Sequence, residues 1–235
     1  PLSLNTYSIT DIFTFTDEIT NVKFNESNLL VSYNVASLFT NVPLDETINI
    51  IADKVFTDDW FNKQHGLNIT RSDVIELLKL AIKDQLFQYH GNLYEQKDGV
   101  GMGSPLGPIM ANTFLCHIEE QLNLPDFSTR YVDDTLTIMP SEVAATNFLN
   151  NLNNFHPSLC FTMEIASNIK LPFLGMLLEK NGAQITTHVF RKPTDKGLLL
   201  HYQSHVDQSY KSALIRTMLN RAYPLSSSRD LFIEE

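Results

Sequence analysis

The sequence predicts an α+β fold, because segments of helical and of strand character are mixed without strict alternation. In several segments, apolar residues recur three and four positions apart, which is typical of amphipathic helices. Elsewhere they form short β-branched runs of strand length, and Asn181-Gly182 is the strongest short-range hairpin signal in the chain. The sequence contains no internal repeat.

The first half is expected to contain a strand, two helices and a hairpin. These elements are the strand 29–35, the helix 45–56, the helix that starts after Thr70 and the hairpin 85–96. Thr70 and Asp73 form a capping-box pattern at a helix start. The apolar face of that helix is expected to hold Val74, Leu77, Leu78 and Ala81. We expect the hairpin to turn at Gly91-Asn92.

The second half opens with a glycine-rich loop and continues with further strands and helices. The expected elements are the loop 99–107, the helix 109–122, the strand pair 130–139, a helix from Ser141 to about 154, the strand 159–165, the hairpin strands 173–180 and 183–190, and the helix 207–223. Pro224 is expected to end the last helix. Residues 226–228, which are all serine, are expected to be loose.

The composition is that of a protein with a buried core. With 235 residues and 43% hydrophobic content, the chain has the size of one large domain or two small ones. No run of about 18 apolar residues occurs and the N-terminus lacks a signal-peptide pattern, so we expect a soluble, intracellular protein. Cys116 and Cys160 are too few for a disulfide framework and have no zinc spacing, and we expect buried free thiols.

The charge of the chain does not favour nucleic-acid binding as a whole. Its formal net charge is -10, and acidic surfaces repel phosphate groups. The distribution is uneven, however: in residues 189–222, six lysines and arginines stand against Asp195 and Asp207. We call residues 189–222 the basic segment, although surface cations often serve only solvation.

The clearest chemical signal is Tyr131-Val132-Asp133-Asp134, in which two adjacent carboxylates lie between apolar strands. A tight turn there would bring both carboxylates to the edge of a sheet, where oxygen ligands bind Mg²⁺. Two such ions about 3.5 to 4 Å apart support in-line phosphoryl transfer. Taken alone, an acidic pair of this kind is also typical of a solvated hairpin turn.

Two other segments support a functional interpretation when they are considered together with this acidic pair. The loop 101–108 contains three glycines, which let the backbone approach a ligand, and two prolines that stiffen the following helix. The segment 32–44 is a strand that reaches the polar Asn34, with the aromatic Phe39 five residues later. By itself, the loop 101–108 is equally compatible with an ordinary helix-entry loop, and the segment 32–44 by itself indicates only a core strand followed by a loop.

In this order and at these distances, the three segments resemble motifs A, B and C of reverse transcriptases. More specifically, the chain resembles Penelope-like retroelement reverse transcriptases from about Tyr7 to Leu225. The resemblance is carried by SYNVASLFTNVPLDETI, GMGSPLGPIMANTFL, RYVDDTL, LPFLGMLLEKNG and FRKPTDKG. It implies a right-hand polymerase palm, with a ferredoxin-like mixed or antiparallel sheet that has helices on one face, plus a partial helical thumb. The implied palm is 1–182, with a primer-grip hairpin starting near 171, and the end of the hairpin and the start of the thumb are 183–235.

The resemblance also implies roles for individual residues. The implied catalytic positions are Asp133, Asp134 and Asn34. The implied ligands of two Mg²⁺ ions, with Mn²⁺ as the alternative metal, are Asp133, Asp134, Asn34 and Val35. The implied nucleotide-binding residues are Phe39, which would exclude ribonucleotides, and Met102, Gly103 and Ser104. The implied nucleic-acid contacts are Leu171, Pro172, Phe173, Leu174, Gly175, Arg191 and Lys192. Many relatives outside this family have Gln where Met102 stands.

The chain departs from the family pattern at Asn34, where motif A has an aspartate. Asparagine retains one carbonyl oxygen but loses a negative charge and presents an N–H donor in place of the second oxygen. We therefore expect weak or absent polymerisation. The family's fingers segment, which would precede the chain, and the GIY-YIG endonuclease of many members are not recognised.

The implied activity is RNA-directed DNA synthesis at a primer 3′-hydroxyl. Its partners would be an RNA template, a DNA primer and deoxynucleoside triphosphates, and the life cycle of such elements implies nuclear residence. Two alternatives stay open at this point: a degenerate palm that binds nucleic acid or protein without polymerising, and a structural α+β domain in which the acidic pair is only a turn.

Overall fold

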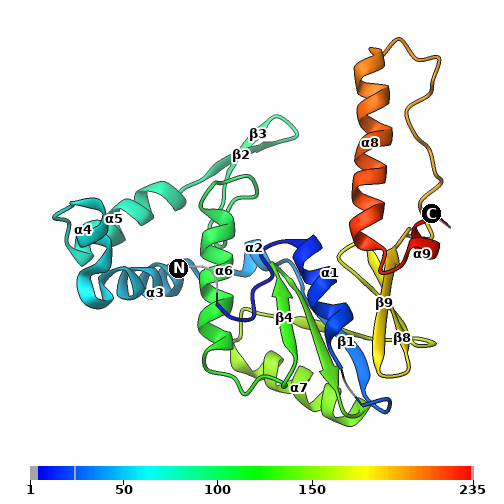
Figure 1. Cartoon of the computed structure of the whole chain (residues 1–235). Coiled ribbons are helices and arrows are strands. Elements are labelled where there is room, and N and C mark those ends of the chain that lie inside the picture. Colours follow the sequence, from blue (N-terminus) through cyan, green and yellow to red (C-terminus); the bar gives the residue numbers. More distant parts are fainter. Residues whose placement is uncertain (1–4, 24, 234–235) are drawn as a thin grey trace. The chain divides into compact units, whose positions relative to one another are not determined.

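The computed structural model describes residues 5–23 and 25–233, in which helices and strands alternate irregularly (Figure 1). The elements are α1 (Ile12–Asn21), β1 (Leu29–Val35), α2 (Leu38–Asn41), α3 (Leu44–Phe56), the 3-10 turn η1 (Thr57–Asp59), α4 (Trp60–His65), α5 (Arg71–Ile82), β2 (Leu86–Tyr89), β3 (Asn92–Glu95), α6 (Gly107–Glu119), β4 (Ser128–Tyr131), β5 (Asp134–Met139), α7 (Glu142–Phe155), β6 (Phe161–Ile165), β7 (Lys170–Phe173), β8 (Met176–Asn181), β9 (Gln184–Val189), α8 (Gln208–Leu225) and α9 (Arg229–Ile233).

Four strands form one sheet in the order β4-β5-β1-β6. Helices, including α6, separate β1 from β4 in the sequence, and α7 separates β5 from β6. The chain thus follows the β-α-β-β-α-β pattern of ferredoxin-like folds, with the β2–β3 hairpin inserted before α6. The predicted α+β fold class is confirmed.

The chain forms two compact units. The first consists of Pro1–Ser8, Tyr33–Thr135 and Thr146–Met163, and the second of Ile9–Ser32, Leu136–Ala145 and Glu164–Glu235. In the first unit, the ring of the fully buried Tyr33 meets the edge of Phe148, with ring centroids 5.3 Å apart. Aromatic pairs of this geometry add packing energy beyond the buried area.

The second unit contains an antiparallel sheet in the order β7-β8-β9. Alternate residues of this sheet are buried, as expected for strands with one covered face. Phe173 packs against Phe15 of α1, with ring centroids 5.6 Å apart. The predicted domain boundary at residue 182 falls within the β8–β9 hairpin, and the assignment of 183–235 to a thumb stays a prediction.

The hairpins are present, but their turns differ slightly from the predictions. The β2–β3 turn is His90-Gly91, and the β8–β9 turn is Gly182-Ala183. A third turn, Leu174-Gly175, interrupts the predicted strand 173–180 and separates β7 from β8. Two-residue turns require positive φ values, and His90 and Leu174 adopt them although neither is glycine. The glycines therefore indicated where the turns occur, but not which two residues form each turn.

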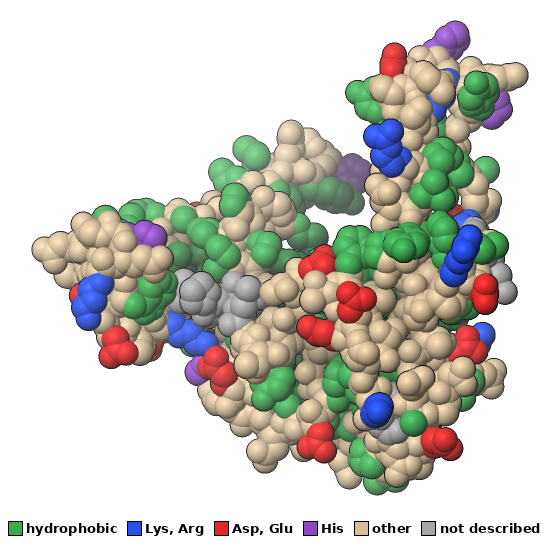
Figure 2. Space-filling model, in the orientation of Figure 1, with side chains coloured by type: hydrophobic (Ala, Val, Ile, Leu, Met, Phe, Trp, Pro, Cys, Tyr) green, Lys and Arg blue, Asp and Glu red, His purple; other side chains and the backbone are tan. Residues whose placement is uncertain are grey.

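Helix α5 begins as predicted, but its apolar face is largely exposed. The capping box is present: the Thr70 amide donates to Asp73 Oδ2 at 2.7 Å, and the Asp73 amide donates to the Thr70 hydroxyl at 3.2 Å. Val74 is buried, whereas Leu77 is 58% exposed and Ala81 is exposed. Hydrophobic side chains are visible over α5 and the β2–β3 hairpin (Figure 2).

Three other expectations were wrong. Cys116 is buried, but Cys160 is exposed. Helix α8 continues through Pro224 to Leu225, one residue beyond the proline that was expected to end it. The serines 226–228 are ordered by hydrogen bonds to β9, through Ser227. In the described part of the chain, no helix is both long and apolar enough to cross a membrane.

Candidate functional site

The structure brings the acidic pair and Asn34 together at the end of β1. Asp133 lies in the tight turn between β4 and β5, in which Val132 has φ 56°. The Val35 amide donates to the Asp133 carbonyl oxygen at 3.1 Å. Asn34 Nδ2 donates to Asp134 Oδ1 at 2.7 Å. Side chains 100 positions apart in the sequence thus meet where β1 ends and β5 begins, at one end of the two central strands of the sheet.

The environment of Asp133 disfavours its negative charge. Burial raises the pKa of this carboxyl, and the neighbouring Asp134 carboxylate raises it further, while a hydrogen bond from its own backbone amide opposes the shift. Desolvation and like-charge repulsion both favour the neutral form, and a cation placed between the two carboxylates would relieve both effects. A cation beside the pair would therefore stabilise the charged form of Asp133.

Two carboxylates at this site are candidate ligands of a divalent cation, one fewer than in the reverse transcriptases that the sequence resembles. Asp133 and Asp134 offer hard carboxylate oxygens, which suit Mg²⁺. The Val35 side chain has no atom that can bind a metal, so only its backbone carbonyl is a candidate ligand. The Asn34 amide faces Asp134 as a donor and already satisfies one carboxylate oxygen. Among residues 5–23 and 25–233, no group of three or more His, Cys, Asp or Glu side chains forms a metal-binding cluster.

Arg130 holds the acidic turn in place and was not recognised from the sequence. It is only 3% exposed, and its guanidinium forms an ion pair with Glu119 of α6. Its Nη1 donates to Asn112 Oδ1 at 2.9 Å and to the Val132 carbonyl oxygen at 2.9 Å. A buried ion pair with additional hydrogen bonds is costly to break. Arg130 therefore positions the turn that carries Asp133.

The predicted nucleotide-binding residues Phe39 and Met102 lie in the same unit as the acidic pair, and a backbone contact links their segments. The Val100 amide donates to the Phe39 carbonyl oxygen at 2.7 Å. A Cβ added to Gly99 would lie 2.5 Å from backbone atoms of Thr40, and Gly99 has φ 71°. Only glycine allows this close approach. The motif A segment and the glycine-rich loop are therefore packed backbone to backbone.

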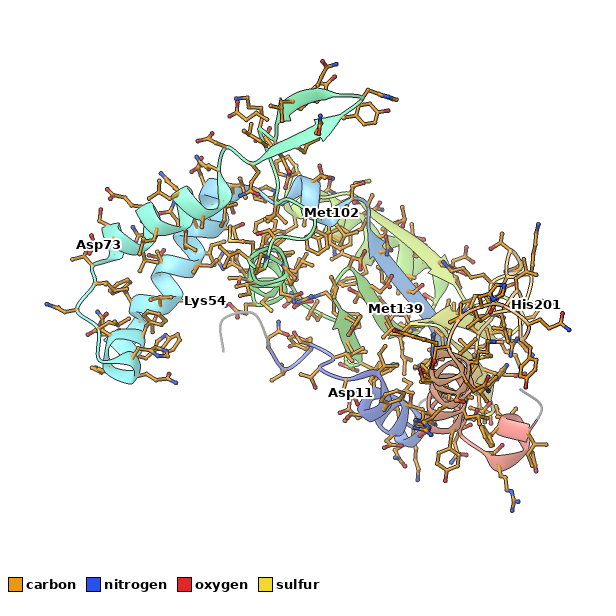
Figure 3. The ribbon with its side chains drawn as sticks, turned by 90° about the horizontal axis from the view of Figure 1, so that it is seen from above. Asp11, Lys54, Asp73, Met102, Met139 and His201 are labelled. Carbon is orange, nitrogen blue, oxygen red and sulfur yellow. The ribbon has the colours of Figure 1, made fainter. Side chains whose placement is uncertain are left out.

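The glycine-rich loop exposes its tip. Met102 is 78% exposed and lies on the loop that leads into α6 (Figure 3). Gly103 is also exposed, and Ser104 folds back, with its amide donating to the Gly101 carbonyl at 3.0 Å. A cavity of about 470 Å³ adjoins the loop. Its walls include Thr40, Leu86, Phe87, Val100, Gly101 and Met102.

The other predicted contacts, 171–175 and 191–192, belong to the second unit. Leu171 and Phe173 are buried in its core, because alternate residues of a strand face the same side. Any ligand contact of this stretch would therefore use Pro172, Leu174 and Gly175. Arg191 and Lys192 directly follow β9 and are exposed.

Comparisons with known proteins support the fold. A telomerase structure from Candida albicans, solved with a fragment of telomeric RNA, matches with a TM-score of 0.60 and 12% identity, over 92% of this chain and 40% of that chain. An apo telomerase from Candida tropicalis matches with a TM-score of 0.56 and 15% identity, over 94% and 42%. The chain thus spans about two fifths of the telomerase chains that it matches. At this identity, the similarity shows a reverse-transcriptase-like fold and no more.

Two sequence comparisons complete the picture. The family profile of an animal helix-turn-helix domain matches residues 198–235, which include α8 and α9. This match covers a small part of the chain, and the sequence analysis had not anticipated it. A search of curated proteins found no match.

Proposed function

We propose that this chain is the palm region of a reverse transcriptase of the Penelope-like kind, and that Asn34 leaves its own polymerase activity weak or absent. One observation carries the proposal: Asn34 and Asp134 meet beside Asp133 at the end of two central strands in a reverse-transcriptase-like fold. A solvated hairpin turn has no need of a polar partner from a distant strand, so the structural-domain alternative is weakened.

In the proposed reaction, a primer 3′-hydroxyl attacks the α-phosphate of a deoxynucleoside triphosphate opposite an RNA template. Asp133 and Asp134 would hold two Mg²⁺ ions, with the Asn34 carbonyl after rotation of its amide and the Val35 backbone carbonyl. When bound, such ions lower the pKa of the attacking hydroxyl and neutralise the leaving pyrophosphate. Phe39 would crowd a ribose 2′-hydroxyl, while Met102, Gly103 and Ser104 would lie under the base pair. Arg130 keeps the acidic turn aligned with β1.

Asn34 impairs this site for two reasons. It removes one negative charge from the metal ligands, and its N–H donor occupies an Asp134 oxygen. Even loss of a partner outside the ligand shell lowers metal affinity or activity by roughly 10- to 100-fold. Loss of a ligand charge should cost at least as much.

The test is primer extension with an RNA template, a recessed DNA primer and deoxynucleoside triphosphates. The wild-type chain should extend the primer little or not at all, and Asn34→Asp should extend it at least about 10-fold faster in Mg²⁺. Asn34→Ala is the matched control, because it removes the amide without restoring the charge, and it should stay inactive. Extension by wild type at the rate of Asn34→Asp would refute the proposed impairment.

A second candidate is a degenerate palm that binds nucleic acid without polymerising. The hydrogen bond from Asn34 to Asp134 favours it, because the acidic site is then satisfied without a metal. Steeply salt-dependent binding of an RNA–DNA duplex, combined with an inactive Asn34→Asp variant, would identify this case. For both candidates, we infer a nuclear location from the life cycle of such retroelements.

A further inference from the structure

Arg221, in the part of the chain that matches the helix-turn-helix profile, lies over the turn between β7 and β8. The turn residue Gly175 has φ 76°, and a Cβ at this position would overlap Arg221 Nη2. The Phe190 amide donates to the Gly175 carbonyl oxygen at 3.0 Å, which joins the end of β9 to the same turn. Within residues 5–23 and 25–233, no carboxylate forms an ion pair with Arg221.

Helix α8 is fixed to the sheet at the end that carries Arg221. Ala222 and Leu225 are buried. Just beyond the helix, the Ser227 amide donates to the Thr187 carbonyl oxygen at 2.9 Å, and the Thr187 amide donates to Ser227 Oγ at 3.0 Å. Figure 1 shows α8 rising from the sheet at this end, while the rest of the helix projects away. The position of the guanidinium over the turn is therefore set by the fold of this unit.

A cavity of about 500 Å³ opens beside Arg221. Its walls are mostly apolar, with two aromatic rings among the lining side chains Val189, Phe190, Leu199, Met218, Leu219 and Phe232. Arg191, Asp195 and Arg221 also line it. The volume lies in the range of about 300 to 1,000 Å³ that is typical of small-molecule sites.

Two arginines, Arg191 and Arg221, and one aspartate, Asp195, are the charged residues that line this cavity, and this balance favours an anionic ligand. The basic segment carries six cations and two acidic residues in a chain whose net charge is -10. One cation of the segment, Lys211, is already used within the fold, since its Nζ donates to the carbonyl oxygens of Tyr202 and Ser204. Within the described part of the chain, no carbonyl or carboxylate pairs with the Arg221 guanidinium in this way. A phosphate on the arginine and a planar base against the apolar wall would satisfy both parts of the site.

We propose that Arg221 and this cavity form a binding site for one nucleotide unit of a single-stranded nucleic acid. The guanidinium binds a phosphate over the β7–β8 turn, and the adjacent base enters the cavity. This inference rests on the proposed function and deepens it, because it assigns a nucleic-acid contact to residues 198–235, which match the helix-turn-helix profile. An acidic peptide has the charge but lacks the planar base, so the cavity favours nucleic acid.

The test measures binding of a fluorescent single-stranded oligonucleotide over a range of salt concentrations. Arg221→Gln should weaken binding by roughly 5- to 10-fold and lower the slope of log K against log salt by about 0.7, the value of one lost phosphate contact. Arg216→Gln removes the same charge from the same helix and should change neither quantity.

A second pair of variants tests the cavity. Leu219 lines it and is 52% exposed, whereas Ile215 lies one turn earlier, outside the cavity, and is 53% exposed. Leu219→Glu should weaken binding clearly more than Ile215→Glu, and both should fold because both positions are half exposed. Poly-glutamate of the same charge should compete poorly with the oligonucleotide.

The outcomes separate this inference from the proposed function. Equal effects of the two arginine variants, or of the two glutamate variants, would overturn the inference. The proposed function would still stand if the wild-type chain binds the oligonucleotide. Equal competition by poly-glutamate would assign the site to an acidic protein and overturn the inference as well. Failure of wild type to bind any oligonucleotide, together with an inactive Asn34→Asp variant, would refute the proposed function itself.

Discussion

Replacing Asn34 by Asp should destabilise the metal-free protein and make its stability depend on Mg²⁺. The substitution removes the hydrogen bond from Asn34 Nδ2 to Asp134 Oδ1, which measures 2.7 Å. Losing a hydrogen bond to a charged group costs about 1.5 to 3 kcal/mol. The new carboxylate would also lie near two others, and like charges about 4 Å apart repel by about 4 kcal/mol at an effective dielectric constant of about 20.

Protonation limits this repulsion. Adding a proton to a carboxyl with a pKa of about 3.9 costs about 4 kcal/mol at neutral pH. The protonated carboxyl can again donate a hydrogen bond to Asp134, so the total loss of stability cannot grow much beyond this cost. We expect Asn34→Asp to lose about 3 to 5 kcal/mol of stability without metal. This corresponds to a fall in the melting temperature on the order of 10 °C for a chain of this size. Magnesium at about 100 times its Kd should restore about 2.7 kcal/mol.

Differential scanning fluorimetry with and without Mg²⁺, after treatment with a chelator, measures both effects. Asn34→Ala is the control, because it loses the hydrogen bond without gaining a charge. Its melting temperature should fall less than that of Asn34→Asp and should rise little with Mg²⁺. Wild type should also gain less from Mg²⁺ than Asn34→Asp. A metal-free Asn34→Asp protein as stable as wild type would refute the reasoning, as would equal Mg²⁺ shifts in all three proteins.

Two further substitutions test the supports of the site. Arg130→Met should lower the free energy of unfolding, measured by urea denaturation, by about 3 to 5 kcal/mol, because it leaves Glu119 charged and nearly buried. Adding Glu119→Leu should recover much of that loss. Additive losses in the double mutant would contradict the pairing. Gly99→Ala should cost more than about 1 kcal/mol and distort the loop, because its Cβ would meet the Thr40 backbone, whereas Gly66→Ala, at a similar positive φ with open space around it, is the control for backbone strain alone.

Features that depend on local rules could be predicted from the sequence. The strand 29–35 was predicted with the bounds that the structure shows, because Leu29, Leu30 and Val31, followed by Tyr33 and Val35 at alternate positions, form an apolar pattern of strand length. The capping box at Thr70 follows from two residues three positions apart. The meeting of Asn34 with the acidic pair was also expected, but this expectation came from the family resemblance and not from spacing. The roles of these residues stay predictions.

Features that depend on distant partners could not be predicted. Arg130 appears in the sequence as an ordinary basic residue, and only the fold brings Glu119 and Asn112 to it. The same holds for Arg221, whose contact with the β7–β8 turn requires α8 to dock on β9. The apolar positions of α5 predicted a buried face, yet Leu77 is exposed. Helical periodicity predicts which residues share a face, but not whether another element covers that face.

The left-handed backbone of Val132 has a consequence for how the acidic pair is made. A β-branched residue strongly disfavours this conformation, at a cost of about 1 to 2 kcal/mol. A free peptide of residues 128–139 would therefore relax into another shape, and its carboxylates would point elsewhere. The turn acquires its form only when the surrounding fold imposes it, so it should be among the last parts of the unit to become ordered during folding, and among the first to lose its geometry when α6 loosens.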